Sequence, residues 1–126
     1  MDMRSPLNRA RGLGSAKEGV GHFWMQRLTA VALAPLALWF AFSVVSLVGA
    51  DHAAFSSWAG NFGNGLLLTL FIIAVYHHLQ LGLQVVIEDY VHGEAAKITG
   101  LILVKLGCFG LGAASVLAVV RVSLGA

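Results

Sequence analysis

One apolar stretch of this chain carries an unusual set of polar side chains. Residues 65–87 include no charged residue, yet they contain a tyrosine, two adjacent histidines and two glutamines: Tyr76, His77, His78, Gln80 and Gln84. Polar groups are costly in apolar surroundings, so they usually face a protein interior, a ligand or water. The stretch is therefore the strongest candidate for a functional site.

On an α-helix these polar side chains fall on two separate faces. With Tyr76 set to zero and about 100° per residue, one face between roughly 40° and 120° holds four of them: His77, Gln80, Gln84 and Glu88. His78 and Asp89 lie at about 200° and 220°. Because adjacent histidines point about 100° apart, His77 and His78 cannot both ligate one iron atom.

A histidine in the middle of a membrane-spanning helix can satisfy its ring nitrogens at low free-energy cost in two ways. His77 and His78 lie about 15 Å from the end of the apolar stretch, which is half the thickness of a hydrocarbon core. A neutral imidazole with one hydrogen bond is a packing residue, whereas an axial ligand has its ring nitrogen satisfied by haem iron. The other histidines lie at or beyond the ends of the apolar stretches: His22, His52 and His92. This chain therefore offers one axial ligand, and a six-coordinate haem needs its second from another subunit or a second copy.

A basic residue borders the first of the three apolar stretches. Arg27 precedes the first one, where its guanidinium can pair with a haem propionate or, alternatively, bind lipid phosphate and set topology.

An acidic segment follows the second stretch, Glu88-Asp89-Tyr90-Val91-His92-Gly93-Glu94. The Tyr90 hydroxyl can donate a hydrogen bond to a carbonyl oxygen at the interface, and Asp89 can orient that donor or relay protons. The alternative is an interfacial aromatic residue followed by a helix end closed by Gly93.

The composition favours lipid as the solvent for the elements that position these residues. The 126 residues are 58% hydrophobic and 11% charged, with a mean hydropathy of +0.81, whereas soluble domains are about 25% charged. One cysteine, Cys108, excludes an internal disulfide and any cysteine-ligated cluster built by this chain alone. The net charge of +2 is assigned to membrane topology, with no nucleic-acid partner.

Three apolar stretches, 28–50, 65–87 and 98–120, are long enough to cross a hydrocarbon core of about 30 Å. Pro35 is expected to kink the first helix without ending it. The sequence therefore predicts an all-α membrane protein with three transmembrane helices in an up-down-up bundle. Residues 28–126 form the anchor domain, and residues 1–27 form a polar N-terminal arm at the inner surface, extended over residues 1–21.

The basic residues predict the orientation. Six lie before the first helix or between the second and third, namely Arg4, Arg9, Arg11, Lys17, Arg27 and Lys97. The loop between the first two helices has none, and Arg121 follows the third. By the positive-inside rule the N-terminus is on the cytoplasmic or matrix side. Three helices leave the polar side chains of the second poorly covered, which indicates a membrane partner.

Two segments resemble a known family. The run Gln84-Val85-Val86-Ile87-Glu88-Asp89-Tyr90-Val91-His92-Gly93-Glu94-Ala95, with a histidine eleven positions before Asp89, resembles the small hydrophobic membrane anchor subunit of succinate dehydrogenase (complex II). The segment Gly19-Val20-Gly21-His22-Phe23-Trp24-Met25-Gln26-Arg27-Leu28-Thr29 is similar to that family's entry into its first helix. The three-helix layout extends the resemblance over nearly the whole chain.

The resemblance implies a multi-pass subunit of the inner (cytoplasmic) membrane that is not catalytic alone. Its partners would be a second membrane anchor (cytochrome b) subunit, an iron-sulfur subunit and a flavoprotein subunit. With the second anchor it would share a haem b and a ubiquinone site that serve the respiratory chain and the tricarboxylic acid cycle.

The resemblance also implies roles for four residues. His78 would be the axial ligand of the haem iron, with His77 as the alternative ligand. Tyr90 would donate a hydrogen bond to ubiquinone, Asp89 would adjoin it in the quinone site, and Arg27 would contact a haem propionate or the quinone site.

Two other functions fit the same pattern of helices. One is the anchor of a fumarate reductase, which has the same architecture and uses menaquinone. The other is a non-redox structural or transporter accessory subunit, in which the histidines pack or relay protons.

Overall fold

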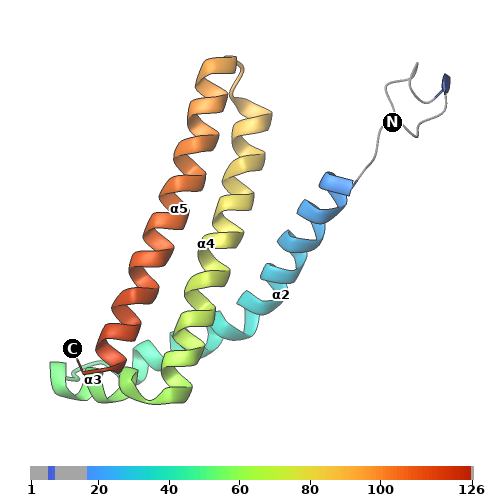
Figure 1. Cartoon of the computed structure of the whole chain (residues 1–126). Helices are drawn as coiled ribbons and strands as arrows, with labels where there is room; N and C mark the ends of the chain where they lie inside the picture. The colour runs from blue at the N-terminus through green and yellow to red at the C-terminus, as the bar shows by residue number, and fades with distance from the viewer. Residues whose placement is uncertain (1–5, 8–16, 126) are drawn as a thin grey trace.

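The computed structural model describes residues 6–7 and 17–125. Residues 17–125 form four helices (Figure 1), α2 (Lys17–Ser46), α3 (His52–Gly60), α4 (Phe62–Tyr90) and α5 (Glu94–Ser123). Within α2, α4 and α5 lie three segments long and apolar enough to span a membrane. The all-α class and the three long apolar helices are thus confirmed, while most of the predicted N-terminal arm lies outside the described residues.

The helices extend beyond the predicted apolar stretches. α2 begins at Lys17, well before residue 28, and includes residues that the sequence placed in an extended arm. It continues through Pro35, as expected, and ends at Ser46, close to Gly49, whose φ of 83° is left-handed. The prediction followed hydropathy, but backbone hydrogen bonding continues into polar residues until a turn interrupts it.

The short helix α3 was not predicted, because its residues were assigned to a loop. Asp51 caps its start by accepting a hydrogen bond from the Ala54 N–H at 2.8 Å. Asn61 ends α3 and caps α4 by accepting a hydrogen bond from Gly63 N–H at 3.0 Å. Trp58 stacks on Trp39 of α2 with ring centroids 5.9 Å apart, which fixes α3 against the long helices.

α4 is the central helix of the fold. It packs against α2 and α5, while the backbones of α2 and α5 stay apart among the described residues. Figure 1 shows the N-terminal part of α2 diverging from the α4–α5 pair. The long helices therefore form an open row rather than a closed bundle.

The open row leaves little buried inside the chain. Among the described residues five apolar ones are buried, namely Ala59, Leu68, Ala74, Leu81 and Cys108. The small residues spaced along one side of α2 are all exposed: Ala30, Ala34, Ala37 and Ala41. Most of the apolar surface therefore faces outward, toward lipid or other subunits.

Candidate functional site

His78 faces α2 and is tied to it by a hydrogen bond. The His78 Nδ1 atom lies 2.9 Å from the Thr29 Oγ1 atom. Thr29 is buried, with 7% of its surface exposed, and its hydroxyl donates back to the Met25 carbonyl oxygen at 2.7 Å. The other ring nitrogen of His78, Nε2, makes no hydrogen bond with the described part of the chain and is not buried by it. One nitrogen of this mid-helix imidazole is thus fixed, and the other keeps some exposed surface.

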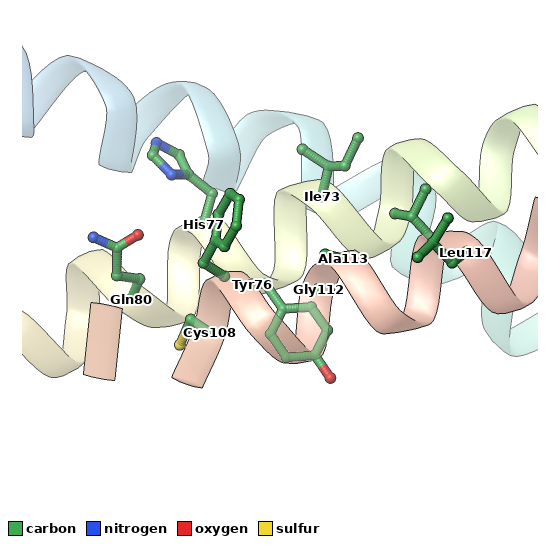
Figure 2. A pocket seen from close by; sticks show the side chains of 10 residues that line it. Ile73, Tyr76, His77, Gln80, Cys108, Gly112, Ala113 and Leu117 are labelled. Atoms are coloured by element: carbon green, nitrogen blue, oxygen red, sulfur yellow. The ribbon is translucent and has the colours of Figure 1, made fainter. Parts of the chain in front are cut away.

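His77 faces a different side of α4, as the 100° spacing predicts. With Tyr76 and Gln80 it lines a pocket of about 530 Å³ between α4 and α5. Figure 2 shows Tyr76 and His77 pointing in opposite directions from α4, between Gln80 on one side and Leu117 on the other. The His77 Nε2 atom is buried and makes no hydrogen bond within the described residues. It is therefore less accessible to a group outside the chain than His78 Nε2.

Two further polar residues of α2, His22 and Gln26, were not among the candidate site residues predicted from the sequence. The Gln26 side chain packs beside Gly82 of α4. A Cβ atom added to Gly82 would lie 3.9 Å from Gln26 Nε2. His22 Nε2 and Gln26 Oε1 are buried without a hydrogen-bond partner among the described residues. His22, Gln26 and Thr29 follow the spacing i, i+4, i+7 of one helix face, a signal that could have revealed them.

Arg27 lies away from the hydrogen bond between Thr29 and His78. Residues two positions apart on a helix point about 200° apart, so Arg27 leaves α2 on nearly the opposite side from Thr29. Its guanidinium carbon lies 5.1 Å from the ring centroid of Phe23, and both side chains are exposed. The structure does not bring Arg27 to the other candidate residues, but leaves it accessible from outside the chain.

Tyr90 and Asp89 occupy the exposed C-terminal end of α4. Tyr90 is the last residue of the helix and is 75% exposed. It lies twelve residues after His78, which is about 18 Å along the helix. Gly93 has a φ of −73° and is the N-cap residue of α5, so it does not close α4 through a left-handed cap. The structure therefore separates the mid-helix His78 from the exposed Asp89 and Tyr90 at the helix end.

Together these features define a class of protein. The chain is a multi-pass membrane protein whose central helix presents an accessible histidine at mid-depth. It also carries an exposed tyrosine and carboxylate at one end of that helix. Such a chain is a subunit of a larger membrane assembly.

Comparison with known proteins identifies the family. A family described as "Succinate dehydrogenase/Fumarate reductase transmembrane subunit" matches residues 1–112. The "Succinate dehydrogenase hydrophobic membrane anchor subunit" of Paracoccus denitrificans is 34% identical over 97% of this chain and 94% of its own length. That of Rickettsia bellii is 33% identical over 83% of this chain and 84% of its own length. No solved structure matches significantly.

The chain therefore belongs to the succinate dehydrogenase/fumarate reductase transmembrane subunit family, among the membrane anchor subunits of succinate dehydrogenase.

Proposed function

We propose that this anchor subunit holds a flavoprotein subunit and an iron-sulfur subunit at the inner (cytoplasmic) membrane of a succinate:ubiquinone oxidoreductase. With a second membrane anchor (cytochrome b) subunit it contributes to a haem b site and a ubiquinone site. The observation that carries the proposal is the accessible Nε2 atom of His78 at the middle of a membrane-spanning helix.

The surroundings of His78 fit an axial ligand of haem. A metal-ligating imidazole usually has its second ring nitrogen hydrogen-bonded, and His78 Nδ1 has such a partner in Thr29. His77 is the alternative ligand, but its Nε2 is buried within this chain, which favours His78. A haem bound there supplies a one-electron store within the membrane. A haem held by His78 would need its second protein ligand from the other anchor subunit, because adjacent histidines point about 100° apart and cannot both reach one iron atom.

The exposed end of α4 supplies the ubiquinone site. Electrons from succinate pass through the flavoprotein and iron-sulfur subunits and reduce ubiquinone, which takes up two electrons and two protons. The Tyr90 hydroxyl donates a hydrogen bond to a quinone carbonyl oxygen and stabilises the negative charge that develops on it. Asp89 adjoins this donor, and other subunits complete the pocket because both side chains are exposed in this chain.

Arg27 completes the set of proposed site residues. Its exposed guanidinium is available to a haem propionate or to the quinone site across the interface with the second anchor. The N-terminal side of the membrane is the inner side, where the soluble subunits bind.

Co-purification of the chain with its partners tests this function. The complex is expected to contain stoichiometric flavoprotein and to show a haem b signal in its reduced-minus-oxidised spectrum. If the purified assembly showed no flavin absorbance and no haem absorbance, that result would contradict the proposal and favour a non-redox accessory subunit.

The fumarate reductase alternative is kept because the matched family includes such subunits. The relatives of this chain named above and a further one are succinate dehydrogenase anchors, which favours ubiquinone as the substrate. The quinone extracted with the complex separates the two, since menaquinone would point to fumarate reductase.

The orientation of the helices can be measured by cysteine labelling. In a Cys108→Ala background, Ser57→Cys in α3 is expected to react with a membrane-impermeant maleimide added outside intact cells. Ala95→Cys, at the start of α5, is expected to react only after the membrane is opened. Both positions are exposed, so the reverse labelling pattern would show that the topology is inverted.

A further inference from the structure

We propose that Thr29 is a positioning residue for His78, which fixes the imidazole as the Nδ1–H tautomer and presents the Nε2 lone pair to iron. The inference rests on the proposed haem ligation by His78. It adds a residue on a different helix that governs whether His78 can act as a ligand.

The positions of the hydrogen atoms follow from counting donors. The Thr29 Oγ1 atom lies 2.7 Å from the Met25 carbonyl oxygen and 3.1 Å from the Gln26 carbonyl oxygen. Both carbonyl oxygens only accept hydrogen bonds, so the single hydroxyl hydrogen of Thr29 points to one of them. The 2.9 Å contact with His78 Nδ1 then requires the hydrogen to come from the imidazole.

This assignment determines what the other nitrogen can do. A neutral imidazole with its hydrogen on Nδ1 has a free lone pair on Nε2. The opposite tautomer would carry a hydrogen on Nε2 and could not ligate iron through that atom, while its Nδ1 lone pair would face Thr29 and not an incoming group. Thr29 therefore selects the tautomer that is competent for ligation.

Thr29 also fixes the plane of the ring. Its hydroxyl is held by its own helix and is buried between α2 and α4, so the acceptor stays in one place. A β-branched side chain on a helix has few rotamers, which adds to this rigidity. An acceptor on Nδ1–H also raises the electron-donating strength of the ligand.

The test compares Thr29→Val with the parent in the purified, co-expressed complex. Valine keeps the shape of threonine but removes the acceptor, so the affinity for haem is expected to fall by roughly 10- to 100-fold. The midpoint potential of the remaining haem is expected to rise, because a weaker donor stabilises ferric iron less. Thr29→Ser is expected to restore both values.

A matched control separates this role from helix packing. Thr69→Val in α4 removes a hydroxyl that donates to the Gly65 carbonyl oxygen at 2.9 Å, the same i to i−4 bond, without a histidine contact. It is expected to leave haem affinity and potential at the parent values. If Thr29→Val does not assemble, Thr29→Ala removes the hydroxyl with less bulk and is measured in the same way.

The possible results are distinguishable. Parent-like affinity and potential in Thr29→Val or Thr29→Ala, with haem lost in His78→Ala, would overturn the role of Thr29 alone. Full haem retention in His78→Ala would overturn the ligand assignment, and the role of Thr29 with it.

Discussion

Replacement of His78 with alanine is expected to remove the haem b signal from the purified complex. The substitution deletes the accessible imidazole and leaves the haem with an axial ligand from the second anchor only. The affinity for haem should fall by more than the roughly 10- to 100-fold expected when only a hydrogen-bond partner of the ligand is removed. The reduced-minus-oxidised spectrum, normalised to flavin, measures it.

His77→Ala is the matched control for this substitution. The two histidines are adjacent, but His77 lines the pocket between α4 and α5 while His78 faces α2. His77→Ala is expected to keep the haem and its redox spectrum. The opposite result, with haem kept in His78→Ala and lost in His77→Ala, would assign the ligand to His77.

Replacement of Tyr90 with phenylalanine is expected to slow ubiquinone reduction by roughly 100- to 1,000-fold, the usual effect of losing one donor to a developing oxyanion. The ring remains, and the side chain is largely exposed in this chain, so the fold should not change. Reduction of a soluble dye by succinate should be retained, because that reaction does not need the quinone site. The two activities measured on the same preparation give the comparison.

Tyr76→Phe provides the control for Tyr90→Phe. Tyr76 lies on the same helix but packs against Gly112 of α5. A Cβ atom added to Gly112 would lie 3.5 Å from the Tyr76 ring. It is expected to leave ubiquinone reduction at the parent rate. Equal loss of quinone and dye activity in Tyr90→Phe would indicate misassembly and contradict a specific role in the quinone site.

Hydropathy predicted the long helices because lipid imposes one requirement on every spanning segment, an apolar surface of sufficient length. It did not predict α3, whose ends are set by the Asp51 and Asn61 side chains. Nor could it locate the start of α2, because the helix continues past the end of the apolar run.

The separation of His77 from His78 was predictable because it depends only on the 100° step between helical residues. The partner of His78 was not, because the hydrogen bond to Thr29 joins residues 49 positions apart. Such a contact depends on how two helices are aligned, which the spacing within either helix does not specify. Tyr90 and Asp89 were placed correctly at a helix end, where both side chains are exposed in this chain.

The open row of α2, α4 and α5 affects how the stability of this chain should be understood. With few side chains buried inside it, the packing that the long helices lack must come from neighbouring subunits and lipid. When folding and association are linked in this way, the free energy of unfolding includes the concentration of the partner. A melting temperature measured on the isolated chain and one measured on the assembled complex are therefore different thermodynamic quantities.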